Sequence, residues 1–465
     1  MWPRACSSPA LPSGRQRMSR TRISSRSRFS ASHSAVARSS GRAKPLMVGI
    51  IRAVVVPSMP DPEKLAAVRA AIPALGAGIY LNTGSAGPIP AETAAAMAEM
   101  STHERDLGRA HPEHFLALVE RMAEARAGVA AVLGTDVDAV ALTHSTTEGM
   151  NLACLLPDWR SDGRVVTSVH DYPGVLGGLY ALRDRTGVEI EFVDAGDDGD
   201  DARTLAAFDT AIGPGTRLVV LSHVLWTTGA VLPVAAIAAM AHDRGALVVV
   251  DGAQAAGAIP FRFDELGVDF YALPAQKWLL GPEGMGALVV DRAATDRFIP
   301  SQAGWFSFER ADGRGMGDWW SDARRFETTG FHAPSVAGMA RSIGWLSMYV
   351  GLDFVYRRGA AMALAAAELL TSIPGVTVLT PRHAMAALLT FTIEGWPPET
   401  AAEELGSRVF AIVRTIPTLR ALRISPGFFT TQDELERFAE AVALLAANTP
   451  ETMPARRILT ILGEG

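Results

Sequence analysis

The stretch Leu247-Val-Val-Val-Asp-Gly-Ala-Gln254 is the most informative part of the sequence. Its apolar run is typical of a strand that is buried on both faces of a sheet, and an acidic residue stands where the run ends. A second run, Phe270-Tyr-Ala-Leu273, follows and leads to Lys277. Because chemistry gathers at the carboxyl ends of parallel strands, Asp251 and Lys277 are candidates for one site.

Similar runs alternate with helical patterns on both sides of this stretch, which predicts an α/β fold with a mostly parallel sheet of seven strands. The expected strands are Ala139–Leu142, Arg164–Ser168, Val188–Val193, Arg217–Ser222, Ala246–Asp251, Phe270–Leu273 and Gly286–Asp291, and the expected helices are Pro112–Leu133, one that starts at Thr147, Val175–Thr186, Leu205–Ile212 and Val234–Arg244.

Beyond about residue 330 the pattern changes to fewer, mixed elements, which predicts a smaller α+β domain at the C-terminus. Its expected elements are helices at Ala360–Ser372, from Pro398 and at Thr431–Ala447, with strands at Val376–Leu379, Leu388–Ile393 and Ala421–Ser425. We therefore expect a leader (1–58), a segment that joins the small domain (59–85), a large domain (86–325) and the small domain (326–465).

The net charge of -6 conceals an uneven distribution, because residues 1–60 contain ten Arg, one Lys and no acidic residue. Such a leader is typical of a transit peptide or a basic nucleic-acid arm. Without amphipathic spacing, a disordered tail or an over-extended translation start fits it better, so we place it outside the fold. No apolar run is long enough to span a membrane, and only two cysteines fit a reducing, cytoplasmic protein. We expect no metal site and neither nucleic acid nor membrane as a partner.

Lysine usage singles out one residue. The chain has three lysines, Lys44, Lys64 and Lys277, against forty arginines. A lysine amine can lose its proton and attack a carbonyl carbon, which an arginine cannot do. Lys277 also has an acid, Asp251, at the end of the neighbouring strand. The two residues together indicate a catalytic site more strongly than an isolated lysine would. A hydroxyl-rich turn, His144-Ser-Thr-Thr-Glu-Gly149, lies between a strand and a helix and could cradle a phosphate.

Three segments together resemble the class V aminotransferase family, which includes the cysteine desulfurases. They are Thr146-Thr-Glu-Gly-Met-Asn151, Val250-Asp-Gly-Ala-Gln254 and Lys277-Trp-Leu-Leu-Gly-Pro282, and the resemblance extends over residues 78–447. It implies a pyridoxal-phosphate (PLP) enzyme of fold type I that acts on a small amino acid. It also implies a homodimer with active sites at the subunit interface.

The resemblance also implies a role for individual residues. Lys277 would hold PLP covalently and later carry a proton, Asp251 would pair with the pyridine nitrogen, and Gln254 would bind the phenolic oxygen. The other implied roles are phosphate binding for Thr146, Thr147 and Gln276, ring stacking for Tyr172, and substrate-carboxylate binding for Arg423, with Arg414 as a second carboxylate ligand. The role of His223 stays open between a cofactor contact and a satisfied strand-end histidine.

This sequence departs from the family pattern in three places. Pro274 and Ala275 offer no hydroxyl before Lys277, and Phe331 stands near the position where many relatives have a phosphate-binding Thr, which suggests a weaker hold on PLP. The stretch Val413-Arg-Thr-Ile-Pro-Thr-Leu-Arg420 lacks the mobile cysteine of the desulfurases. Cys154 lies on an apolar helical stretch typical of a core, so persulfide formation on the enzyme is disfavoured.

Within the family, the chain most resembles the cysteine/cystine C–S lyases and the isopenicillin-N-epimerase-like branch. The features are Leu221-Ser-His-Val-Leu-Trp-Thr-Thr-Gly229, the Gly304-Trp305 loop and the spacing of Arg414 and Arg423. The leading prediction is β-elimination that cleaves a C–S bond in a cysteine-type amino acid. An aminotransferase, an epimerase and a non-catalytic PLP-fold binding protein remain as alternatives.

Overall fold

The computed structural model describes residues 61–159, 163–328 and 330–454. The expected leader, residues 1–58, and Cys6 lie outside the described residues. Within the described ranges, no helix combines the length and the apolar character that a membrane span needs.

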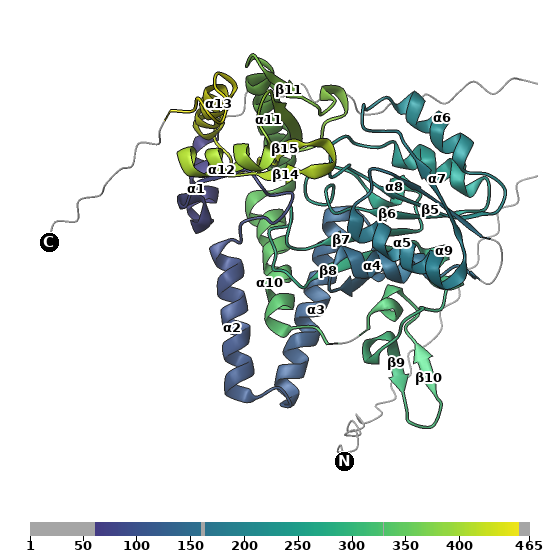
Figure 1. Ribbon diagram of the computed structural model, residues 1–465. Coiled ribbons are helices and arrows are strands. Elements are labelled where there is room, and N and C mark those ends of the chain that lie inside the picture. The colour runs from purple at the N-terminus through teal and green to yellow at the C-terminus, as the bar shows by residue number, and fades with distance from the viewer. Residues whose placement is uncertain (1–60, 160–162, 329, 455–465) are drawn as a thin grey trace, which may run out of the picture. The chain divides into compact units, whose positions relative to one another are not determined.

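A seven-stranded sheet forms the centre of the larger part of the fold (Figure 1). All neighbouring strands run parallel except β8, which is antiparallel to both of its neighbours, β2 and β7. The predicted α/β class with a mostly parallel sheet is therefore confirmed. The strand order is β2 (Val140–Thr143), β8 (Gly286–Val290), β7 (Phe270–Pro274), β6 (Leu247–Asp251), β5 (Thr216–Ser222), β3 (Arg164–Ser168) and β4 (Glu189–Val193).

Alternate residues of the central strands enter two separate cores, which is why the strands read as continuous apolar runs. In β6, Val248 and Val250 pack with α3 and α7 on one face, whereas Leu247 and Val249 pack with α4 and α5 on the other. Helices thus cover both faces of the sheet. The helices of this part are α3 (Pro112–Leu133), α4 (Thr146–Cys154), α5 (Pro173–Thr186), α6 (Asp201–Ala211), α7 (Val234–His242), α8 (Phe263–Leu266) and α9 (Arg292–Arg297).

The carboxyl ends of the central strands lie side by side at one edge of the sheet. Asp251 ends β6 and pairs in register with Ser222 at the end of β5 and with Ala272 in β7. The chain leaves β7 at Pro274 and reaches Lys277 within one turn. The sheet therefore brings the acid and the lysine to the same edge, as the sequence predicts.

A smaller antiparallel sheet, in the order β11-β12-β15-β14, carries the C-terminal part of the chain. The N-terminal segment lies beside it, because β1 pairs with β13 in a separate two-stranded sheet and Asn82 forms a bridge with Ser425, one residue after β15. The strands are β1 (Ile79–Tyr80), β11 (Val376–Val378), β12 (Leu389–Ile393), β13 (Ala411–Ile412), β14 (Arg414–Ile416) and β15 (Ala421–Ile424), and the helices are α1 (Pro62–Ala70), α11 (Leu352–Thr371), α12 (Pro398–Val409) and α13 (Gln432–Ala446).

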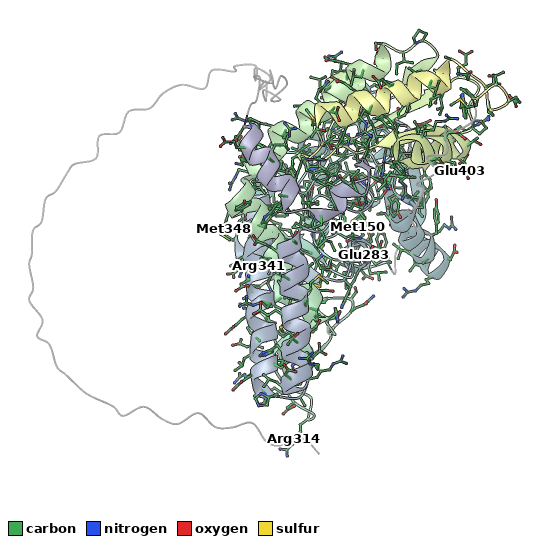
Figure 2. All side chains as sticks on the ribbon, turned by 90° about the vertical axis from the view of Figure 1, so that its left-hand side faces the viewer. Met150, Glu283, Arg314, Arg341, Met348 and Glu403 are labelled. Atoms are coloured by element: carbon green, nitrogen blue, oxygen red, sulfur yellow. The ribbon has the colours of Figure 1, made fainter. Side chains whose placement is uncertain are left out.

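Several elements escaped the sequence analysis. Helix α2 (Ala91–Leu107) is rich in alanine and buries only Thr93 and Met100, so it has no clear apolar periodicity. Helix α10 (Ala333–Gly344) packs between α2 and α3 (Figure 1) and continues into a π-helical turn, Trp345–Val350. Figure 2 labels Arg341 of α10 and Met348 of this turn. A short hairpin, β9 (Phe308–Ala311) and β10 (Gly317–Trp319), was also missed. The domain boundaries remain predictions.

A buried ion pair ties helix α3 to the segment that precedes α10. Arg126 Nε and Nη2 donate to the two carboxylate oxygens of Glu327 at 2.8 and 3.1 Å. Glu327 is 1% exposed and also accepts a hydrogen bond from the Leu142 amide at the start of the sheet. One carboxylate thus links α3, β2 and the segment after Phe326.

We expect Arg126→Ala to lower the free energy of unfolding by about 3–5 kcal/mol, because it leaves the Glu327 charge buried without its partner. The control is Arg357→Ala, which breaks the exposed pair with Asp353 and should cost less than about 1 kcal/mol. Denaturant unfolding of both variants provides the measurement. Equal losses in the two variants would contradict a structural role for the buried pair.

Candidate active site

A cavity of about 210 Å³ opens at the carboxyl edge of the large sheet and receives side chains from both sheets. All nine residues that the sequence analysis assigns to the site line it. The lining residues are Gly84, Ser85, Ser145, Thr146, Thr147, Tyr172, Val175, Trp226, Asp251, Ala253, Gln254, Pro274, Gln276, Lys277, Arg414 and Arg423.

Lys277 stands in a tight turn whose backbone is hydrogen-bonded and closely packed. The Gly87 amide donates to Gln276 O at 2.7 Å, and a Cβ on Gly87 would lie 2.2 Å from Lys277 O. Leu280 closes the turn with a φ of 54°. Burial lowers the pKa of the Lys277 amine to about 8; Asp251 opposes this shift, while Arg423 and Arg414 add to it. The amine can therefore lose its proton near neutral pH.

Asp251 supplies the only acidic side chain among the lining residues. Its Oδ1 accepts a hydrogen bond from the Ala253 amide at 2.8 Å. Burial raises the pKa of this carboxyl, and the nearby Lys277 partly offsets the shift. His223 lies behind it, where its ring contacts the Tyr271 hydroxyl at 3.0 Å, and burial lowers its pKa to about 4. His223 is thus a satisfied core histidine that does not line the cavity.

The N-terminus of α4 forms one end of the cavity. Ser145 caps the helix by accepting from the Glu148 amide at 3.1 Å, which leaves the Thr146 and Thr147 hydroxyls at the cavity wall. Gln276 joins this end; its Oε1 is buried without a hydrogen-bond partner, and its Nε2 is the atom that can donate to an anion. Phe331 stacks on His144 with ring centroids 4.8 Å apart, so it contributes packing and no hydroxyl. Together these groups suit an anion at a helix N-terminus.

Gln254 and Tyr172 close the sides of the cavity. Gln254 Nε2 donates to Gly84 O at 2.8 Å and its Oε1 accepts from the Trp278 indole at 3.0 Å, so one Nε2 hydrogen remains available. The Tyr172 ring lies 5.7 Å from Lys277 Nζ and meets the Trp226 ring edge-on at 5.5 Å.

The turn that presents Tyr172 is fixed by the buried carboxylate of Asp171. It accepts hydrogen bonds from the amide and hydroxyl of Ser222, from the Ser168 amide and from the Thr167 hydroxyl. Burial still raises its pKa.

Arg414 and Arg423 face the cavity from opposite positions of two antiparallel strands, β14 and β15. Arg423 is 1% exposed and donates to Trp226 O at 2.7 Å, and burial and Arg414 lower its pKa to about 9. Among the described residues, no carboxylate pairs with either guanidinium, and the Nε atoms of both are buried without a partner. Arg414 is half-buried beside the buried Arg423, and two like charges held away from water are costly unless an anion joins them.

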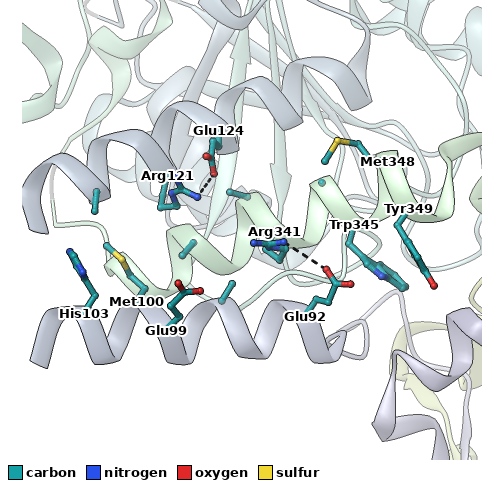
Figure 3. A pocket seen from close by; sticks show the side chains of 15 residues that line it. Glu92, Glu99, Met100, His103, Arg121, Glu124, Arg341, Trp345, Met348 and Tyr349 are labelled. Atoms are coloured by element: carbon teal, nitrogen blue, oxygen red, sulfur yellow. Dashed lines mark ion pairs between the residues drawn. The ribbon is translucent and has the colours of Figure 1, made fainter. Parts of the chain in front are cut away.

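A second, larger cavity of about 580 Å³ lies between α2, α3 and α10 (Figure 3). Two ion pairs lie along it: Arg121 lies 2.8 Å from Glu124, and Arg341 lies 3.8 Å from Glu92. His103 Nε2 and Trp345 Nε1 are buried in its lining without a hydrogen-bond partner, but none of the nine residues assigned to the site from the sequence lines this groove.

Ser85 and Trp226 are among the lining residues that were not predicted from the sequence. Ser85 lies in the loop Asn82-Thr-Gly-Ser85, in which the glycine is the only residue whose type indicates that another segment packs closely against the backbone. A Cβ on Gly84 would lie 2.8 Å from both Gln254 Oε1 and Ser425 Oγ. Trp226 lies in the segment that resembles the C–S lyases, but it was not singled out. Cys154, in contrast, is buried in α4 outside the cavity lining, and burial raises its pKa to about 12.

The chain is similar to known proteins over most of its length. Isopenicillin N epimerase of Streptomyces clavuligerus is 32% identical over 393 residues, which cover 79% of this chain and 94% of that protein. A probable cysteine desulfurase of Methanothermobacter thermautotrophicus is 27% identical over 399 residues, which cover 82% of this chain and 97% of that protein.

Among solved structures, the cystine C–S lyase C-DES in complex with its product cysteine persulfide matches with a TM-score of 0.76 and 25% identity, over 80% of this chain and 99% of that chain. A C-DES mutant with glycine covalently linked to PLP matches with a TM-score of 0.77 and 25% identity, over 81% and 98%. These matches confirm fold type I of the PLP enzymes. The family model "Aminotransferase class-V" matches residues 79–438. The chain belongs to the class-V aminotransferase family.

Proposed function

We propose that this protein is a PLP-dependent enzyme that cleaves a C–S bond of a cysteine-type amino acid by β-elimination. The observation that carries the proposal is the composition of one cavity: a buried amine, a buried carboxylate, and one buried and one half-buried arginine without an acidic partner. The amine can react with an aldehyde cofactor, the carboxylate can bind the ring nitrogen of that cofactor, and the arginines can bind the carboxylate of an amino acid.

The described residues fit PLP at both ends of the cofactor. Asp251 would hold the pyridine nitrogen protonated, since its carboxylate is buried beside the cavity and needs a cation or donor. Gln276 Nε2 and the hydroxyls of Thr146 and Thr147 would donate hydrogen bonds to the phosphate. Gln254 would donate its free Nε2 hydrogen to the phenolic oxygen, and Tyr172 would stack on the ring. When bound, PLP supplies an electron sink next to the substrate Cα.

The chain's own residues would then carry out three tasks. Lys277 would hold the cofactor and, once a substrate amine has taken its place, accept the proton from Cα, which a pKa of about 8 permits. Arg423 would bind the α-carboxylate, held in place by the Trp226 carbonyl. Tyr172 and Trp226 would cover the reacting atoms and exclude water.

Three observations favour C–S cleavage without an enzyme persulfide. The structure of the cystine C–S lyase C-DES matches this chain over almost the whole length of that protein. The two arginines would bind both carboxylates of a substrate such as cystine. No cysteine lines the cavity among the described residues, and the buried Cys154 thiol has a pKa of about 12, which disfavours a persulfide-forming desulfurase.

A second candidate is an epimerase, and the 32% identity with isopenicillin N epimerase favours it. The same Lys277 would remove the α-proton, and a proton would return to the opposite face instead of a sulfur group leaving. An aminotransferase would use the same residues, but Lys277 would deliver the proton to the cofactor and not back to Cα. A non-catalytic PLP-binding protein is the remaining alternative.

We also propose that the protein acts as a homodimer. Large apolar side chains are exposed on α3 and in the segment after α9, including Phe115 (46%), Leu116 (60%) and Trp305 (68%). A second copy of the chain would cover apolar surface of this kind, and exposed patches commonly mark such interfaces.

The reaction is tested by incubating the PLP-loaded protein with cystine, cysteine and isopenicillin N in D2O. β-Elimination breaks the Cα–H and Cβ–S bonds, so we expect pyruvate, ammonia and a sulfur product from cystine, with no activity in Lys277→Ala. Formation of the opposite α-epimer with deuterium at Cα and the sulfur retained would instead establish the epimerase. PLP-loaded protein that neither exchanges the α-proton nor forms product would identify a binding protein.

The arginine pair predicts how the enzyme distinguishes substrates. Arg423→Lys should lower kcat/KM about thirtyfold to thousandfold, because one ammonium cannot replace a two-pronged contact worth about 2–4 kcal/mol. Arg414→Lys should be mild for a monocarboxylate and severe for cystine. The matched control is Arg420→Lys, an exposed position between the same strands. If Arg423→Lys keeps wild-type kcat/KM on every substrate, the carboxylate binds elsewhere.

A further inference from the structure

The two arginines of the cavity converge on one neutral oxygen. Arg414 Nη1 donates to Ser85 Oγ at 3.2 Å, and Arg423 Nη2 donates to the same oxygen at 3.1 Å. The two contacts join residues that are 329 and 338 positions apart in the chain. A serine hydroxyl therefore occupies the point between a buried and a half-buried cation where an acidic partner would be expected.

The donor and acceptor capacity of this hydroxyl decides what it can do. A hydroxyl has two lone pairs and one hydrogen. Both lone pairs of Ser85 Oγ are engaged by the arginines, so its hydrogen can only be donated. Within the described ranges, this hydrogen has no protein acceptor, and Ser85 lines the cavity. The cavity thus contains an unused O–H donor flanked by two guanidinium groups.

The loop that carries Ser85 is fixed on both sides. The Ser85 amide donates to Asn82 O at 2.9 Å, and the Thr83 amide donates to Ser425 O at 3.3 Å, one residue after β15. Gly84 O accepts from Gln254 Nε2 at 2.8 Å. The hydroxyl is therefore held relative to the arginine strand and to the large sheet before any ligand binds.

We propose that Ser85 is a specificity residue for the carboxylate of the substrate. Its lone pairs hold Arg414 and Arg423 in a convergent arrangement, and its hydrogen is donated to the bound carboxylate. This inference rests on the proposed function in that the substrate is an amino acid, but not on which bond the enzyme breaks. Ser85 reduces the repulsion between the two cations without neutralising them, whereas an acidic residue there would compete with the substrate.

The test measures binding of simple carboxylates to the PLP-loaded protein by isothermal titration calorimetry. Propionate and succinate are the probes, and neutral propionamide is the reference. We expect the wild type to bind both carboxylates and not propionamide. Ser85→Ala should bind propionate about tenfold more weakly, the loss typical of a hydrogen bond to a charged group. Ser85→Thr keeps the hydroxyl and should restore binding.

Matched variants separate this role from a merely structural one. Ser407→Ala removes an exposed serine hydroxyl that bonds only a helix carbonyl and should leave carboxylate binding unchanged. In turnover, Ser85→Ala should raise KM for the amino acid more than it lowers kcat, with the visible absorbance of bound PLP unchanged. Wild-type affinity for propionate in Ser85→Ala would overturn the inference. Equal weakening of propionate binding in Ser85→Ala and Ser85→Thr would also overturn the inference.

Failure of the proposed function has a different signature. If the wild type does not bind either carboxylate, the arginine pair is not a substrate site and the proposed function fails with it. If the wild type binds carboxylates in the Ser85-dependent way but does not release sulfur from any substrate, the inference stands and C–S cleavage is wrong.

Discussion

The constraint on which this site depends is the charge balance of a buried cavity. Three cationic side chains, Lys277, Arg414 and Arg423, face a single acid, Asp251. Away from water, each uncompensated ion costs several kcal/mol, and the pKa values respond accordingly. The pKa of Lys277 falls to about 8, that of Arg423 falls to about 9, and that of Asp251 rises. A site with this surplus of positive charge is suited to bind a phosphate and a carboxylate together.

The fold creates this surplus by joining two sheets at one edge. The large parallel sheet supplies Asp251 and Lys277, and the small sheet supplies both arginines as a directly opposed pair, an arrangement that is unfavourable for like charges. Hydrogen bonds between the two parts offset this cost. Thr380 and Thr390 donate to the carbonyls of Thr228 and Thr227, in the loop that follows β5. The same loop carries the Trp226 carbonyl, which accepts a hydrogen bond from Arg423. One loop therefore both contacts the small sheet and orients the arginine that is the candidate for substrate binding.

The sequence predicted the parts of the fold in which local pattern and tertiary environment agree. Buried parallel strands need apolar residues on both faces, so β3, β6 and β7 could be recognised with nearly correct ends, together with the residues that follow them. Helix α2 could not be recognised, because alanines that face solvent and alanines that face α10 look alike. The position of Ser85 against the arginines was also beyond prediction, since it depends on a close approach of loops that are more than three hundred residues apart.

The most direct test of this site is a pH series of PLP capture by the apoprotein, stopped with borohydride and followed by peptide mapping. We expect a reduced pyridoxyl label on Lys277 alone among the three lysines. We also expect the initial capture rate to rise with pH through a midpoint near 8, because the deprotonated amine is the nucleophile and its pKa is lowered from 10.5. A label on Lys44 or Lys64, no label at all, or a midpoint near 10.5 would contradict the role of Lys277 as the cofactor lysine.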